Sequence, residues 1–331
     1  MNGMDVLRES LDEHADLASG GAGLLDDVTT GAARLRRRRR ITAATAAGVL
    51  VLAVVATLAA GQFARPALTP AAPYSRGMLQ LGASVAAGSG FELQGYVTSP
   101  DVQRLVLGQE VQAEVHDPGT YDPSTLAGAE RIGLGNGATG FALPVFTPKD
   151  APGTAVAAVA RRDATGAWII AYGKVPQDLL VKAAVAVQIG PPRDVRAPLR
   201  LGFVPDGLRA VSVDSRPADV LTILSFQDAD HRLVLWAMSQ LGQNVQFAAL
   251  FGPPVPIAGH DTWYVTKDNS DWFGDNDTSA AALVVQYEPG CSLTLRTPDA
   301  RTVTRAMLEQ MARETRFGSC TDRSTWTTLL G

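Results

Sequence analysis

A run of arginines directly before a long apolar segment is the feature that most constrains this chain. Residues 34–40 read RLRRRRR, and residues 41–60, ITAATAAGVLVLAVVATLAA, contain no charged side chain. A helix of this length rises about 30 Å, which is the thickness of the hydrocarbon core of a bilayer. The sequence therefore predicts one N-terminal transmembrane helix over residues 41–60, with the lipid bilayer as a partner.

The same arginines predict the orientation of this helix. Cationic residues stay on the cytoplasmic side of an inserted helix, and the arginine run precedes the span whereas only Arg65 and Arg76 follow closely. We expect residues 1–40 to be a cytoplasmic tail and the C-terminus to be extracytoplasmic, in a single-pass protein of the cell membrane. A cleaved signal peptide is the alternative, although the charged region of such a peptide is normally far shorter than this tail.

The acidic tail is predicted to contain a short amphipathic helix. In residues 4–18, MDVLRESLDEHADLA, acidic side chains occupy one side, and helical spacing brings apolar ones together on the other. The apolar face consists of Val6, Leu7, Leu11 and Leu17. Because a segment of this length buries little core by itself, we expect this face to bind a cytoplasmic protein partner if it is ordered.

The chain beyond the span divides into a stalk and a globular part. Residues 61–77 contain Pro66, Pro70 and Pro73, which favour an extended stalk. From residue 78 onward, short β-type runs alternate with turn residues, and helical patterns are confined chiefly to residues 176–187 and 302–316. The sequence predicts an α+β fold with mainly antiparallel strands.

Two segments of this outer part share one order of elements. Residues 157–190 and 282–318 both read strand, glycine-containing turn, strand and helix. The repetition predicts two pseudo-duplicated sheet-plus-helix lobes, residues 78–190 and 191–331. Chance recurrence is the alternative, because this arrangement of elements is common.

The distribution of charge argues against nucleic acid as a partner. The tail holds equal numbers of acidic and basic residues, so the net charge of −4 lies entirely in the rest of the chain, with 26 of the 33 acidic and 22 of the 29 basic residues. The one basic cluster abuts the predicted membrane span, where attraction to anionic lipid is its natural use.

The two cysteines, Cys291 and Cys320, both fall on the side that we place outside the cell, where disulfides persist. We predict a structural disulfide between them. It would close a loop of about thirty residues, which stabilises a fold by about 3.5 kcal/mol on a chain-entropy estimate.

The remaining motifs do not predict catalysis, a metal site or a cofactor. The histidines His14, His116, His231 and His260 are far apart and lack zinc-ligand spacing. No nucleophile-elbow or zinc-protease motif occurs. Three aromatic residues, Trp263, Tyr264 and Trp272, cluster beside a polar loop, and we predict that they form a binding surface for an envelope ligand or partner. Burial of Trp263 and Val265 in the core is the alternative.

The arrangement resembles uncharacterised single-pass membrane proteins of actinobacteria. The resemblance is carried by the acidic tail, the polyarginine run, the apolar span, the proline stalk and the outer stretches LRLGFVPDGLRAVSV and LVVQYEPGCSLTLRT. It implies an extracytoplasmic, non-catalytic binding or sensing domain. Such proteins are loosely similar to membrane-bound anti-sigma regulators, which implies a regulator acting through the cytoplasmic tail as an alternative. An envelope hydrolase with an unrecognised site is a further one.

Overall fold

The computed structural model describes residues 76–108, 110–135, 137–148, 153–242, 247–270, 273 and 278–330. The predicted tail, membrane helix and most of the stalk lie outside these residues, as do Val6, Leu7, Leu11, Leu17 and Trp272. Within the described part, no helix has the length and apolar character needed to cross a membrane. Its strands and helices belong to one compact unit.

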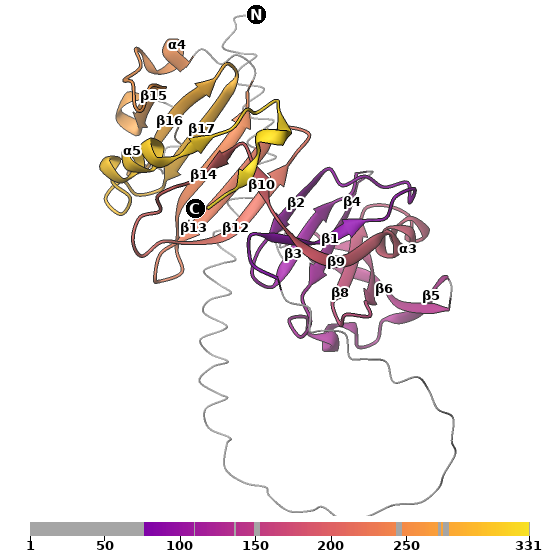
Figure 1. The fold of residues 1–331 in the computed structure, drawn as a ribbon. Helices are drawn as coiled ribbons and strands as arrows, with labels where there is room; N and C mark the ends of the chain where they lie inside the picture. The colour runs from indigo at the N-terminus through magenta and orange to yellow at the C-terminus, as the bar shows by residue number, and fades with distance from the viewer. Residues whose placement is uncertain are drawn as a thin grey trace, which may run out of the picture. The chain divides into compact units, whose positions relative to one another are not determined.

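Most of the described strands form one large antiparallel sheet of 13 strands (Figure 1). Apolar and polar residues alternate along many of these strands, as expected of strands whose two faces meet different surroundings. In order across the sheet the strands are β15 (Asp261–Thr266), β16 (Ala281–Glu288), β17 (Cys291–Thr297), β14 (Leu233–Leu241), β13 (Leu221–Gln227), β12 (Arg209–Arg216), β2 (Gly95–Thr98), β3 (Val102–Val106), β4 (Val111–His116), β8 (Trp168–Gly173), β7 (Val156–Arg162), β6 (Ala138–Phe146) and β5 (Glu130–Gly135).

Three smaller antiparallel pairs complete the described strands. In the first, β1 (Gln80–Val85) pairs with β9 (Val187–Asp194). The other two join the C-terminal tail to the segment before β12. They pair β10 (Arg196–Ala197) with β19 (Thr327–Thr328), and β11 (Leu199–Arg200) with β18 (Arg316–Phe317).

Both predicted helices are confirmed. Helix α3 (Gln177–Ala186) packs against β7 and β8, and α5 (Arg305–Glu314) packs against β16 (Figure 1). Thr304 caps the N-terminus of α5 by accepting a hydrogen bond from the backbone N–H of Met307. Shorter helical turns are η1 (Pro123–Leu126), α4 (Phe247–Phe251), η2 (Lys267–Asn269) and η3 (Arg323–Thr325).

Arg161, on β7 of the sheet, caps the C-terminus of α3. The guanidinium of Arg161 donates from Nε to the carbonyl of Ala184 at 2.7 Å and from Nη2 to the carbonyl of Val187 at 2.6 Å. The last carbonyls of a helix have no partner within the helix and carry partial negative charge. Arg161 therefore satisfies the C-terminus of α3 and ties the helix to β7.

The core lies on both faces of the sheet. On β8, Ile169 and Ala171 face the main hydrophobic cluster, which includes residues of α3 and α5. The alternate residues Ile170 and Tyr172 face a second cluster on the other side. Near β15 a third cluster forms around Trp263. This two-sided burial explains why several strands read as nearly continuous apolar runs.

The predicted α+β class with mainly antiparallel strands is confirmed. Residues 157–190 and 282–318 do form the expected strand, turn, strand and helix, as β7, β8 and α3 and as β16, β17 and α5. However, strands of both segments belong to one sheet, because β12 pairs with β2, with Val213 opposite Thr98. A duplication of two lobes is not shown by this arrangement. The predicted lobe boundary beside Pro191 lies within β9 and stays a prediction.

Candidate functional site

A groove lies at the β15 end of the large sheet, between α5 and residues 251–257. Its cavity volume is about 140 Å³. Tyr264 and Thr262 come from β15, Leu283 from β16, and Arg305 from α5. Because several separate elements contribute to it, the groove exists only in the folded protein.

One wall of the groove is a tight turn that is hydrogen-bonded to β15. The backbone N–H of Val255 donates to the carbonyl of Thr262 at 2.8 Å, and Ile257 and His260 exchange two backbone hydrogen bonds of 3.0 Å. Between them, Ala258 and Gly259 have positive φ angles of 52° and 84°. Positive φ at both central residues is typical of type I′ hairpin turns. The turn therefore holds the apolar side chain of Ile257 in a defined position.

Tyr264 and Arg305 meet inside the groove. The guanidinium carbon of Arg305 lies 4.8 Å from the centroid of the Tyr264 ring, which is the geometry of a cation–π contact. Burial raises the pKa of the Tyr264 hydroxyl, and the Arg305 charge opposes this rise. The tyrosine is therefore a neutral, half-buried ring that positions the arginine.

The rim of the groove carries one carboxylate between two arginines. Glu309 accepts from Arg305 Nε at 2.7 Å with one oxygen and from Arg313 Nη2 at 3.0 Å with the other. Both pairs have the i, i+4 spacing that brings side chains together on a helix. The triad carries a net positive charge.

The structure places the predicted aromatic surface on two faces of the sheet. Trp263 is 4% exposed and packs against Phe247 on the face opposite to Tyr264. Its indole Nε1 donates to the carbonyl of Gly252 at 2.9 Å. Neighbouring residues of a strand point to opposite faces, which separates the two side chains, although part of Trp263 also borders the groove. With Trp272 outside the described residues, a ligand surface made of all three stays a prediction.

The predicted disulfide between Cys291 and Cys320 is confirmed. The two Cα atoms are 6.2 Å apart, and both residues are only 1% exposed. Cys291 begins β17, and Cys320 lies in the C-terminal tail after β18. The bond therefore joins the tail to the hairpin of β16 and β17.

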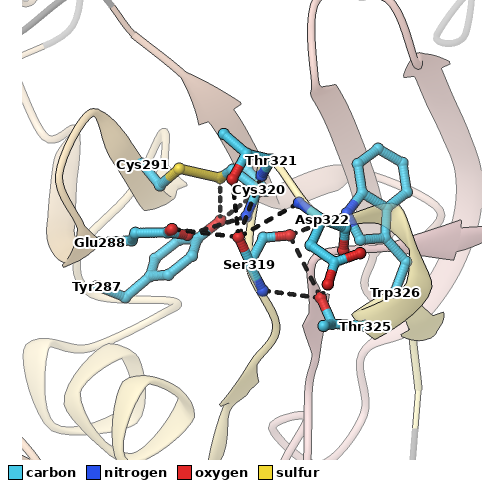
Figure 2. Close-up of a disulfide and its surroundings, with 10 residues drawn as sticks. Tyr287, Glu288, Cys291, Ser319, Cys320, Thr321, Asp322, Thr325 and Trp326 are labelled. Carbon is cyan, nitrogen blue, oxygen red and sulfur yellow. Dashed lines mark hydrogen bonds between the residues drawn. A yellow bond between two sulfur atoms is a disulfide. The ribbon is translucent and has the colours of Figure 1, made fainter.

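Glu288 and Tyr287 take part in hydrogen bonds beside this disulfide (Figure 2). The carboxylate of Glu288 accepts from Ser319 Oγ at 3.1 Å and from the backbone N–H of Cys320 at 3.0 Å. The Tyr287 hydroxyl lies 2.9 Å from Cys320 Sγ and 3.0 Å from Ser239 Oγ. A disulfide sulfur carries no hydrogen, so the tyrosine donates to it. Burial raises the pKa of Tyr287 to about 12.

Glu288 and the two sulfurs also have the spacing of a metal-ligand set. The carboxylate oxygen and both Sγ atoms lie within 4.8 Å of one another. Zinc is bound by thiolates, however, and here the two sulfurs are bonded to each other. Both oxygens of Glu288 already accept hydrogen bonds. Glu288 and the two cysteines therefore form a hydrogen-bonded disulfide cross-link.

Three aromatic rings connect the disulfide with the groove. Tyr287 stacks on Phe317 with ring centroids 4.2 Å apart, and Phe317 meets His260 edge-on at 5.1 Å. His260 closes the turn that carries Ile257. The wall of the groove thus rests against the same hairpin and tail that the disulfide joins.

A pair of titratable residues that was not predicted lies on β4. His116 Nε2 and Glu114 Oε2 are 3.0 Å apart, and the His116 ring packs on Tyr121 at 5.0 Å. The spacing of Glu114 and His116 in the sequence indicates this pair, because residues i and i+2 of a strand share a face. Within the described part of the chain, no serine, threonine or cysteine side chain is hydrogen-bonded to His116.

No family model and no curated protein matches this chain. Among solved structures, it is similar to one described as the complex structure of Pseudomonas aeruginosa MucA/MucB, with 12% identity over 72% of this chain and 93% of that chain and a TM-score of 0.22. A second is described as MucB in complex with MucA(peri), with 13% identity, the same coverages and a TM-score of 0.20. We draw no functional conclusion from similarity of this degree.

Proposed function

We propose that this chain is a single-pass membrane protein whose residues 78–331 form an extracytoplasmic, non-catalytic binding or sensing domain. The observation that carries the proposal is the groove of about 140 Å³ beside Tyr264. Apolar side chains line it together with the polar groups of Thr262, Arg305 and Glu309, a combination that can hold and orient a ligand. The membrane anchor is supported by the arginine run and the uncharged segment 41–60.

The chemistry of the groove favours binding over catalysis. General acid or base catalysis needs a group that titrates near the working pH and reaches the reacting atom. Here the carboxylate of Glu309 is shared by two guanidinium groups, and the pKa of Tyr264 is raised above its already high value. The hydroxyl of Thr262 donates to the carbonyl of His260. These groups are suited to orienting a ligand.

A selection of ligands from a displayed peptide and small-molecule library tests this function on the full-length chain in lipid nanodiscs. We expect selected ligands to lose about tenfold or more in affinity with Ile257→Arg, which places a charge in the apolar wall. Val185→Arg is the matched control, because Val185 is 45% exposed on α3, away from the groove lining. Ligands that bind both variants equally, or a selection that yields none, would overturn the proposal.

A second function is a regulator that acts through the cytoplasmic tail. The observation in its favour is the predicted apolar face of Val6, Leu7, Leu11 and Leu17 beside an acidic face. In this case one cytoplasmic protein should co-purify with the full-length chain and be lost with Leu11→Asp. Glu9→Asp, on the acidic side, should retain it. An unchanged set of co-purifying proteins would contradict this function and leave the groove proposal standing.

A further inference from the structure

The charge balance at the groove indicates the polarity of its ligand. Each oxygen of Glu309 accepts a hydrogen bond from an arginine, Arg305 or Arg313, so the negative charge of this carboxylate in the described lining is outweighed. The side chain of Arg305 is 54% exposed, and its ion pair with Glu309 uses Nε. A guanidinium has four further N–H donors on its two terminal nitrogens. An arriving ligand therefore meets hydrogen-bond donors and positive charge, to which a carboxylate is complementary.

The size of the cavity indicates how much of the ligand enters it. A volume of about 140 Å³ is close to that of an engineered cavity of about 150 Å³ that holds benzene. One apolar side chain of the size of leucine or phenylalanine fits this space. Ile257, Pro253 and the buried Leu283 supply apolar surface for it.

The surface beside the cavity indicates that the ligand continues past it. Val255 is 59% exposed at the rim, and Leu250, on the neighbouring helix α4, is 48% exposed. A small molecule that fills the cavity leaves these side chains in water. A polypeptide that places one side chain in the cavity and continues past it would bury this exposed apolar surface.

We propose that the groove binds a polypeptide segment in which an apolar residue is followed directly by an acidic one. The apolar side chain enters the cavity beside Tyr264 and Ile257, the carboxylate pairs with Arg305, and the flanking residues cover Val255 and Leu250. This inference rests on the proposed binding function and adds the chemical class of the ligand.

Short capped peptides test the inference by fluorescence anisotropy against the full-length chain in nanodiscs. The probe contains a Leu-Glu pair between glycine and serine residues, and the comparison peptides carry Leu-Gln, Leu-Lys or Ala-Glu instead. We expect the Leu-Glu peptide to bind about tenfold more tightly than the Leu-Gln and Ala-Glu peptides, and the Leu-Lys peptide most weakly.

Variants of Arg305 then test whether this residue causes the difference in affinity between the peptides. Arg305→Gln should remove the difference between the Leu-Glu and Leu-Gln peptides while leaving the affinity of the Leu-Gln peptide unchanged, and Arg305→Lys should restore part of the difference. Arg301→Gln is the matched control, because Arg301 is an exposed arginine that pairs with Asp299 and does not line the groove. An equal loss in Arg301→Gln and Arg305→Gln would indicate general electrostatic attraction and overturn the inference.

Other outcomes separate this inference from the binding function. Equal binding of the Leu-Glu and Leu-Gln peptides would overturn the role of the carboxylate, while groove-dependent binding of both would keep the binding function. If none of the peptides binds but phenylacetate does, and Ile257→Arg prevents it, the polypeptide class is wrong and the groove is still a binding site. If neither peptides nor phenylacetate bind, this inference fails, and the library selection decides the function independently.

Discussion

The ring of Phe317 stacks on the ring of Tyr287, with centroids 4.2 Å apart and planes inclined by 14°. Tyr287 contacts the sulfur of Cys320 through its hydroxyl, and Phe317 contacts His260 at the wall of the groove. Packed rings transmit displacement because protein interiors are dense. The disulfide and the candidate binding site are thus parts of one packed structure, and changes at the disulfide should be measurable in the groove.

Loss of the disulfide should lower the stability of the outer domain. Cys320→Ser removes a cross-link with a sequence separation of 29 residues, which corresponds to about 3.5 kcal/mol in the free energy of unfolding. Urea unfolding of the full-length chain measures this change. The double variant Cys291→Ser, Cys320→Ser should lose no more than the single one, and a fully additive loss would show that the cysteines act separately.

Tyr287 should make stability fall at alkaline pH. Its pKa is raised to about 12 in the folded protein, compared with about 10 in an unfolded chain. A group with a raised folded-state pKa stabilises fully below the unfolded pKa, and this contribution is lost as the pH rises through the folded pKa. Between about pH 10 and 12, the wild type should therefore lose roughly 2–3 kcal/mol more than Tyr287→Phe. Parallel pH profiles of the two proteins would refute this assignment.

Arg161 should stabilise the C-terminus of α3. Arg161→Met leaves the carbonyls of Ala184 and Val187 without their charged donor, which should cost about 2 kcal/mol. Arg162→Met, at the exposed neighbouring position, should change stability by less than about 0.5 kcal/mol. Thermal unfolding of both variants provides the comparison, and equal effects would contradict a specific capping role.

The predicted topology can be tested with reporters fused after residue 331. An alkaline phosphatase fusion, which is active only after export, should be active, and a fusion that fluoresces only in the cytoplasm should be dark. Replacing residues 36–40 by glutamine should produce a mixture of orientations, because the charge difference across the span is largely removed. A C-terminal reporter active only in the cytoplasm would show that the orientation is wrong.

Local pattern predicted much of the fold. Alternating or continuous apolar runs identified β8, β13, β14 and β17, and stripes of helical spacing identified α3 and α5. Turn chemistry was harder to recognise. Residues 104–115, RLVLGQEVQAEV, have the composition of one β-type run but form parts of β3 and β4, because the chain reverses near Gly108 and Glu110, whose φ angles are 74° and 61°.

Pairing between distant strands could not be predicted from local pattern. The joining of β12 to β2, and of β1 to β9, depends on tertiary packing across more than a hundred residues. Of the glycine-rich residues 133–140, Gly133 and Gly135 lie in β5 and Gly140 lies in β6, and the register shifts between Gly133 and Gly135. Glycine in a strand is a weak strand signal, and it often marks such an irregularity.

The same limit applies to the candidate site. Cys291 and Cys320 could be paired from the sequence because there were only two cysteines and one compartment to consider. Tyr264 was predicted as part of a surface, but its contact with Arg305 requires α5 to lie beside β15. The local sequence around Tyr264 or Arg305 does not predict this contact.

The pairing of β18 and β19 with β11 and β10 has a consequence for biosynthesis. The strands β10 and β11 pair with β19 and β18, which follow them by more than a hundred residues. A nascent polypeptide therefore cannot complete these two strand pairs before residue 328 has been made. Any product that terminates before Cys320 carries Cys291 as a free thiol, so a truncated molecule is chemically distinguishable from a finished one.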